Sequence, residues 1–217
     1  MIRRFNKITG KSIEKIYGQE RLAYSMSGNE DLYDLIEWSK RGGYQGSVIC
    51  FYDLETGDVY QPFEKKANVV YGQPAFAEGS YYFLKGDYDE GSVILYRYLP
   101  GETPEAVIEL KLHETNLYNL RVIGNPIHIV SQDDVFRCYY PEAFSFPLQP
   151  NETVCLIEDG KVYIEAWIEE GWDDENDCAT DAYDFYHRII TKDFEGNTIS
   201  EETGCLCQAA DGTWWIS

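Results

Sequence analysis

Ser92-Val93-Ile94-Leu95-Tyr96-Arg97-Tyr98-Leu99 is an apolar and aromatic run that ends at the turn Pro100-Gly101 and is followed by a further short apolar run. The run Ser47-Val48-Ile49-Cys50-Phe51-Tyr52-Asp53-Leu54 lies 45 residues earlier and meets a glycine turn in the same way. Two strand-like runs that flank a glycine turn are typical of a β-hairpin. Weaker copies stand at 135–140 and 186–190. The sequence therefore predicts an all-β chain built from successive hairpins.

A second glycine precedes each hairpin and separates two further strand-like runs. These glycines are Gly28, Gly79, Gly124, Gly160 and Gly212. Five units in this chain average about 43 residues each, which is the length of a four-stranded propeller blade. The predicted blades cover 20–63, 73–112, 114–147 and 152–202, and the fifth takes its inner strands from 204–217 and its outer strands from 2–17.

The two chain ends complete this pattern only if they are joined. Thr213-Trp214-Trp215-Ile216-Ser217 reads as a strand without a partner after it, and the segment from Ile2 to Gly10 reads as the strand and turn that should follow. We therefore predict a single domain over 1–217, a five-bladed β-propeller closed by N- and C-terminal strands that share one blade. Deleting the first ten or the last five residues should then unfold the whole domain.

The segment 29–43 conflicts with this scheme, because its pattern also suits a helix. Acidic residues precede its apolar positions, basic residues follow them, and Gly42 and Gly43 end it. The blade pattern requires a strand over 30–41, and we predict the strand because consistency among five units outweighs local propensity. A helix remains the alternative.

Composition narrows the class of partner. The chain has 217 residues and a formal net charge of −20, so nucleic acid and anionic membrane surfaces are not expected as partners. The N-terminus has no apolar run typical of a secretion signal, and the six cysteines contain no CxxC pair. We predict a cytoplasmic monomer with free thiols and no cofactor.

The run Ile94-Leu95-Tyr96-Arg97-Tyr98-Leu99-Pro100-Gly101 resembles the blade pattern of bacterial β-propeller repeat proteins, in which an aromatic strand precedes a Leu-Tyr-Arg-Tyr strand and a glycine turn. The resemblance extends over the whole chain but is clear in only one blade. It implies a propeller with binding surfaces. It implies no particular chemistry, and no functional residue is carried over from it.

Acidic residues gather in the loops that should join the second and third strands of the blades, at 41–46, 86–91, 132–134 and 169–184. The candidate ligand-binding residues on this face are Asp87, Trp172, Asp173 and Asp177. A flexible acidic loop could bind calcium, but the insertion lacks the spacing of a known calcium loop. We interpret it as a solvated acidic loop and predict no metal site.

Glu-Thr pairs should enter three inner strands and place Glu114, Glu152 and Glu202 near the channel mouth. Such residues commonly cap turns, and this is the interpretation we favour. A carbohydrate-active hydrolase with these carboxylates at the mouth is the alternative. The three histidines and the cysteines Cys155, Cys205 and Cys207 are interpreted as structural.

The predicted function is accordingly a non-catalytic binding module that uses its acidic loop face. Its partner would be a protein or a small polar or cationic ligand. No catalytic residue is predicted. A lectin is a weaker alternative, because sugar-binding lectins of this kind usually require export.

Overall fold

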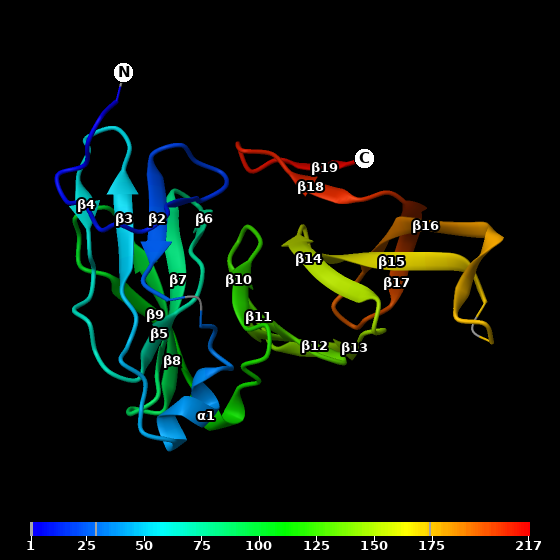
Figure 1. The fold of residues 1–217 in the computed structure, drawn as a ribbon, viewed down its shortest axis with the longest axis horizontal. Helices are drawn as coiled ribbons and strands as arrows, with labels where there is room; N and C mark the ends of the chain where they lie inside the picture. Colours follow the sequence, from blue (N-terminus) through cyan, green and yellow to red (C-terminus); the bar gives the residue numbers. More distant parts are fainter. Residues whose placement is uncertain (1, 29, 174) are drawn as a thin grey trace.

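The computed structural model describes residues 2–28, 30–173 and 175–217. Residues 29 and 174, which belong to the predicted strand-or-helix segment and to the acidic insertion, lie outside the described residues. Over these described residues the chain is 50% strand and 4% helical, which confirms the all-β class. Its strands form five antiparallel sheets that follow one another in chain order (Figure 1).

Sheets 1 to 3 come from the first two thirds of the chain. Sheet 1 contains β1 (Glu14–Lys15), β2 (Leu22–Met26), β3 (Ile49–Asp53) and β4 (Val59–Tyr60). Sheet 2 contains β5 (Val69–Tyr71) and β6 (Ala75–Ala77), which both pair with β7 (Ser80–Asp87), followed by β8 (Ser92–Tyr98) and β9 (Glu105–Lys111). Sheet 3 contains β10 (Arg121–Ile123), β11 (His128–Gln132), β12 (Val135–Tyr140) and β13 (Phe144–Pro147).

The remaining strands form a four-stranded sheet and a hairpin. Sheet 4 contains β14 (Glu152–Glu158), β15 (Lys161–Asp173), β16 (Cys178–Lys192) and β17 (Thr198–Thr203). Sheet 5 consists of β18 (Leu206–Gln208) and β19 (Trp214–Ile216). Two short helical segments, α1 (Leu35–Lys40) and the 3₁₀ turn η1 (Leu112–Glu114), connect strands. No helix among the described residues is long and apolar enough to cross a membrane.

Four of the five marker glycines occupy equivalent turns. Gly79, Gly124, Gly160 and Gly212 join the first hairpins of sheets 2 to 5, and their φ angles lie between 71° and 90°. This left-handed conformation costs glycine little and other residues more. In sheet 1 the equivalent turn holds Gly18, with φ 83°, so the assignment of Gly28 to this role was wrong. The first sheet therefore begins earlier than the sequence pattern suggested.

The predicted pairing of the chain ends is not formed in the described chain. Strand β19 pairs with β18, and sheet 5 has two strands. The N-terminal segment lies instead along the β3–β4 hairpin, where the Asn6 amide donates to Gly57 O at 2.8 Å and the Phe5 ring packs on Tyr52. Because β1 is the first strand of sheet 1, the residues before it cannot also complete sheet 5. The prediction that the two termini share one blade is therefore wrong.

The predicted strand over 30–41 is also wrong, because the helical alternative forms there as α1. Asp31 Oδ1 accepts hydrogen bonds from the backbone N–H groups of Tyr33 and Asp34 and so starts the turn before the helix. Leu32 and Leu35 are buried in a core shared with sheets 2 and 3. Local hydrogen bonding and this burial together stabilise the helical segment.

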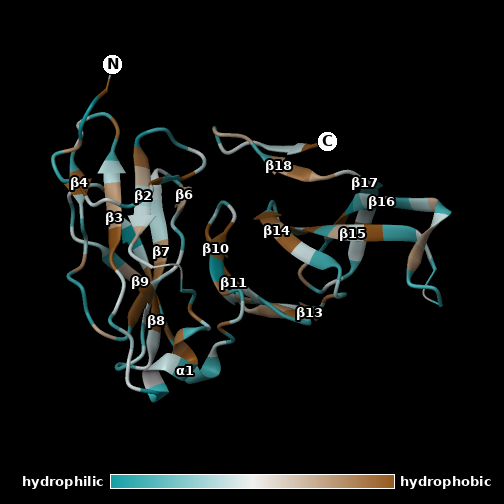
Figure 2. Cartoon of the chain, viewed as in Figure 1, coloured by the Kyte–Doolittle hydropathy of each residue, from teal (hydrophilic) through white to brown (hydrophobic). Residues whose placement is uncertain are grey.

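Apolar clusters join sheets 1 to 4 in chain order, and hydrophobic residues recur along the strands of these sheets (Figure 2). Phe51 of sheet 1 and Phe83 of sheet 2 are fully buried, with ring centroids 5.7 Å apart. Further clusters join sheets 2 and 3 with α1, and sheets 3 and 4. None of the clusters in the described chain includes a residue of β18 or β19. Sheet 5 meets sheet 1 through the Gly18 amide, which donates to Ala210 O at 3.2 Å.

Candidate functional site

Asp87, a predicted ligand-binding residue, is buried at the end of β7 and already paired. Its carboxylate lies 2.8 Å from Lys66 Nζ and 3.6 Å from Lys85 Nζ, and it accepts the Glu90 N–H. Burial alone would raise the pKa of Asp87, but the bonds from Lys66 and the Glu90 N–H hold that pKa below its ordinary value. Asp87 therefore fixes the β7–β8 turn and offers no free oxygen face to a ligand.

The three predicted channel-mouth carboxylates lie in separate elements. Glu114 is exposed in η1 and pairs with Lys111 Nζ at 3.0 Å. Glu152 is buried at the start of β14, with Lys192 Nζ at 3.5 Å. Glu202 is exposed in β17, the outer strand of sheet 4. No hydrogen bond or ion pair between described residues joins any two of them, so they form no ring of carboxylates.

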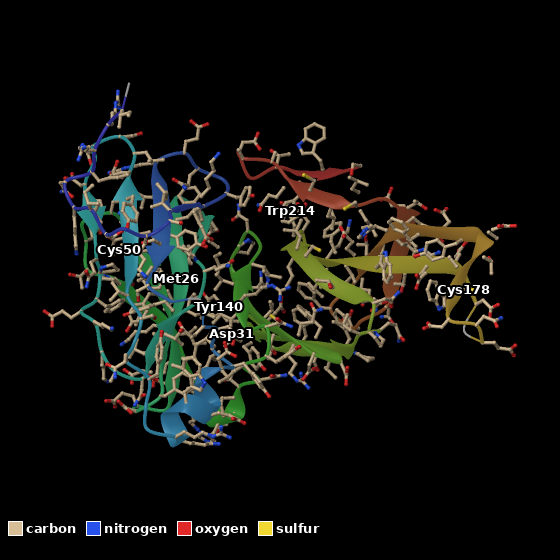
Figure 3. All side chains as sticks on the ribbon, viewed as in Figure 1. Met26, Asp31, Cys50, Tyr140, Cys178 and Trp214 are labelled. Carbon is tan, nitrogen blue, oxygen red and sulfur yellow. The ribbon has the colours of Figure 1, made fainter. Side chains whose placement is uncertain are left out.

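The acidic insertion is the tip of a long hairpin arm formed by β15 and β16, so most of the predicted loop 169–184 is strand. Asp173 Oδ1 accepts two backbone N–H groups of the tip turn, and Asp177 adopts a φ of 50° in it. Trp172 is 41% exposed and packs edge-on against a tyrosine of β16. The arm extends away from the other sheets, with Cys178 at its end (Figure 3). Asp173 thus caps the turn at the tip of the arm.

Other predicted loops of the acidic face do lie side by side. The Tyr88 hydroxyl of the β7–β8 turn donates to a backbone carbonyl just before α1. The rings of Tyr33 and Tyr118 meet at 5.5 Å, which connects the α1 segment to the chain before β10. Asn116 Nδ2 then donates to Asp133 Oδ2 in the β11–β12 turn at 2.6 Å. These contacts make one continuous surface, but they also occupy several of its polar groups.

A central cavity of about 830 Å³ lies where the first hairpins of all five sheets approach one another. It is lined by residues of β6, β10, β14 and β18 and by the turns at Gly18 and Gly212. Strand β10 contacts both β7 and β14, so sheet 3 sits between sheets 2 and 4 at this point. The cavity therefore depends on the packing of first hairpins from separate sheets.

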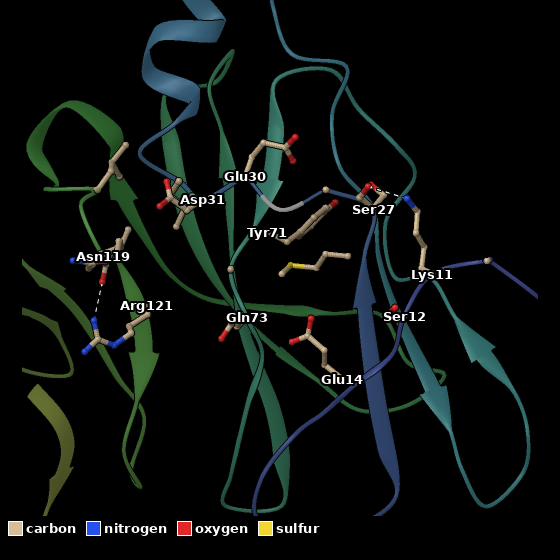
Figure 4. Close-up of a pocket in the computed structure, with 17 residues that line it drawn as sticks. Lys11, Ser12, Glu14, Ser27, Glu30, Asp31, Tyr71, Gln73, Asn119 and Arg121 are labelled. Carbon is tan, nitrogen blue, oxygen red and sulfur yellow. Dashed lines mark hydrogen bonds between the residues drawn. The ribbon is translucent and has the colours of Figure 1, made fainter. Parts of the chain in front are cut away.

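A second cleft, of about 650 Å³, adjoins the cavity between sheets 1, 2 and 3 (Figure 4). Gln73 and Arg121 line both spaces, so the two are continuous. The cleft is mixed in character, with the Tyr71 ring and apolar side chains beside charged groups. Its charged lining residues are Lys11, Glu14, Glu30, Asp31 and Arg121.

Two of the cleft carboxylates are held by tyrosine hydroxyls, one from the buried Tyr24 and one from the partly buried Tyr44. Tyr24 OH donates to Glu14 Oε2 at 2.7 Å, and Tyr44 OH donates to Glu30 Oε2 at 2.8 Å. Burial, and then the bond to Glu30, raises the pKa of Tyr44 to about 12, so this hydroxyl remains a donor at neutral pH. The second oxygen of each carboxylate makes no hydrogen bond to a described residue. Each carboxylate is thus oriented and still has an oxygen available to a ligand.

Arg121 is a cation without a carboxylate partner in the described chain. Its guanidinium donates from Nη2 to Val154 O at 2.6 Å and from Nη1 to Asn119 O at 3.3 Å. Burial lowers the pKa of Arg121, but an arginine remains charged at any physiological pH. Backbone carbonyls of sheet 4 and of the chain before β10 therefore hold this cation at the junction of cleft and cavity.

Sequence reasoning did not identify the residues of the cleft. Glu14, Glu30 and Asp31 are far from Arg121 in the chain, and only the packing of three sheets brings them to one space. One signal was present, since Arg121 is a charged residue in the strand-like run that precedes Gly124. A buried position for such a residue implies a specific partner or a ligand.

Family models, curated proteins and solved structures were compared with the chain, and none matches it. What the cleft can do therefore follows from its own side chains. Carboxylates, an aromatic ring and a guanidinium can hold the charged and polar groups of a small molecule. Among its described lining residues there is no histidine or cysteine to act as a nucleophile or general base.

Proposed function

We propose that the chain is a non-catalytic binding module that takes a small polar ligand with a cationic group in the cleft between sheets 1, 2 and 3. The observation that carries this proposal is the presence of Glu14, Glu30 and Asp31 around one space of ligand size. Clefts of roughly 300–1,000 Å³ are typical of small-molecule sites. The net charge of −20 adds long-range attraction for a cation.

The same proposal includes a five-bladed β-propeller of the kind found in bacterial repeat proteins, with a fifth blade reduced to the β18–β19 hairpin. Four sheets of consecutive antiparallel strands and a central cavity lined by five first hairpins support it. In this arrangement the ligand cleft opens beside the propeller axis. Sites at such junctions take residues from several blades, as this one does.

We place the ligand in the cleft rather than on the acidic loop face. Asp87 and Asp133 of that face are already paired with cations, Lys66 and Arg137. Glu14 and Glu30 of the cleft instead accept from neutral tyrosine hydroxyls, and neither forms an ion pair with a described residue. We do not propose the hydrolase alternative, because its three carboxylates do not meet.

A thermal-shift experiment with agmatine, a small dication, tests this function, with glucose as the uncharged comparison. At a hundred times its Kd a ligand stabilises the folded state by about 2.7 kcal/mol, which corresponds to a rise in Tm of roughly 5–10 °C for a chain of this size. We expect this rise for the wild type with agmatine and none with glucose.

Variants then locate the effect. In Glu14→Gln/Glu30→Gln the amide oxygens can still accept from the two tyrosines, but the negative charges are gone. We expect this variant to keep its own Tm and to lose the agmatine shift, while the exposed Glu64→Gln control behaves as the wild type. No shift with wild-type protein, or an equal shift in the double variant, would contradict the proposal.

A further inference from the structure

Three side chains of metal-binding type meet outside the cleft, at the edge where sheet 4 leads into sheet 5. Glu165 lies in β15, His187 lies in β16, and Cys205 lies between β17 and β18. One ligand atom from each of these residues lies within 4.8 Å of the others. All three residues are partly buried, so the cluster is held within the fold and is still accessible to an ion from solvent.

The sheet register explains why the first two side chains meet. Trp167 pairs with His187, and Glu165 is two residues before Trp167 on β15. Residues two apart in a strand share a face, so Glu165 and His187 are diagonal neighbours on one face of sheet 4. Their arrangement is set by paired backbone and does not depend on loop conformation.

Backbone hydrogen bonds bring Cys205 to the same place. The Gly204 amide donates to His187 O at 2.9 Å, which holds the chain against β16 just before the cysteine. The Leu206 amide, just after it, donates to Glu165 Oε2 at 2.8 Å. Cys205 is therefore fixed on both sides by bonds to the other two members of the cluster.

The His187 ring has an unsatisfied atom. Nδ1 is buried and makes no hydrogen bond within the described chain, although Glu165 Oε1 lies only 2.7 Å away. A separation of 2.7 Å is short enough for a hydrogen bond. The angle prevents the bond, because the oxygen lies away from the direction in which an Nδ1–H group points. A buried ring nitrogen that makes no hydrogen bond is uncommon and needs an explanation. An ion between Nδ1, the carboxylate and the thiol provides one.

The chemical types of the three ligand atoms indicate which metal ion would bind. A thiolate, an imidazole and a carboxylate together suit Zn²⁺, whereas magnesium and calcium prefer oxygen ligands. Tetrahedral zinc with bonds of about 2.0–2.3 Å holds its donors about 3.3–3.8 Å apart. The ligand atoms lie within 4.8 Å of one another, with Nδ1 and Oε1 at 2.7 Å, so side-chain movements of the order of 1 Å are needed to reach that spacing. The bond from Leu206 to Glu165 Oε2 is an outer contact of the kind that orients a ligating carboxylate.

We propose that Glu165, His187 and Cys205 bind one Zn²⁺ ion through Oε1, Nδ1 and Sγ, with the fourth coordination position open. The ion crosslinks sheet 4 to the chain that leads into the β18–β19 hairpin. This hairpin contributes to none of the apolar clusters of the described chain. The metal is therefore a structural clamp for the end of the chain, distinct from the ligand cleft.

Metal titration of the full-length chain tests the site. Protein freed of metal with a chelator is titrated with Zn²⁺ and, as a spectroscopic probe, with Co²⁺. We expect one equivalent of zinc, a thiolate-to-cobalt charge-transfer band, and slower amide hydrogen exchange across 206–217 in the zinc form. Failure of the wild type to bind a stoichiometric ion would overturn the proposal, and the three residues would then be a hydrogen-bonded cluster.

Variants assign the ligands. Cys205→Ser should lose the charge-transfer band, and Glu165→Gln and His187→Gln should each weaken zinc binding at least tenfold. The controls Cys178→Ser and His113→Gln, which alter an exposed thiol and an exposed ring, should bind as the wild type does. Far-ultraviolet circular dichroism in chelator confirms that each variant is folded. Retention of the band in Cys205→Ser, or equal losses in the controls, would assign the metal elsewhere.

Discussion

Removal of the terminal hairpin should lower stability without unfolding the domain, although it deletes one of the five sheets of the described chain. Truncation after Cys205 removes 206–217 and with them four hydrogen bonds to the rest of the described chain: Gly18 N–H to Ala210 O, Leu206 N–H to Glu165, and the reciprocal backbone pair between Cys205 and Ser217. At about 1 kcal/mol for each net hydrogen bond, these losses amount to about 4 kcal/mol. No buried apolar cluster of the described chain loses a member. The truncation therefore adds no large loss of hydrophobic stabilisation to the free energy of unfolding.

Urea denaturation followed by far-ultraviolet circular dichroism measures this cost, in chelator so that metal binding does not contribute. We expect a cooperative transition with a lower midpoint and a nearly unchanged m value, since the truncation removes little of the surface exposed on unfolding. Pairing of the chain ends had predicted that loss of the last five residues would unfold the domain. If the truncated chain shows no cooperative transition, the hairpin is integral to the fold and our reasoning from contacts is wrong.

Other expected outcomes test the packing and the charges. Phe83→Ala should lower the unfolding free energy by about 3–5 kcal/mol, because it empties a fully buried site between sheets 1 and 2; a loss under 1 kcal/mol in urea denaturation would contradict that packing. Gly124→Ala should destabilise by at least about 1 kcal/mol more than Gly160→Ala, because its Cβ would lie 2.6 Å from a carbonyl of sheet 4 whereas the other meets nothing within 4 Å. Equal losses would mean that sheets 3 and 4 do not meet there. Burial alone would raise the pKa values of Asp53 and Asp87, but hydrogen bonds hold both pKa values below 3.8, the ordinary value. The two carboxylates therefore stabilise the folded state fully above about pH 4. This stabilisation is lost as the pH falls through their folded-state pKa values. Asp53→Asn should make the acid decline in stability shallower, and parallel curves would contradict this.

Hairpins were predictable from sequence because their signals are local. Gly79, Gly124, Gly160 and Gly212 mark turns that need a positive φ, and the apolar runs beside them form the expected strands. The first unit was misplaced because Gly18 and Gly28 both follow the pattern, and only strand pairing distinguishes them. That single choice moved the N-terminal segment into the wrong sheet and produced the false pairing of the ends.

The sites were not predictable for a different reason. The cleft carboxylates and Arg121 come from segments about a hundred residues apart in the chain, and the packing of sheets determines their meeting. The predicted acidic residues were found by composition, which detects charge but not whether a lysine or a turn already occupies it. Asp87 and Asp173 illustrate the two cases.

Calorimetric titration of agmatine into the wild-type chain tests the central claim, that the cleft carboxylates bind a cation. We expect a single site whose affinity falls as salt concentration rises, because salt screens the charges that attract the ligand. We also expect no measurable binding to Glu14→Gln/Glu30→Gln and unchanged binding to Glu64→Gln. No measurable heat with the wild type, or equal affinity in the double variant, would show that the cleft is not a cation site.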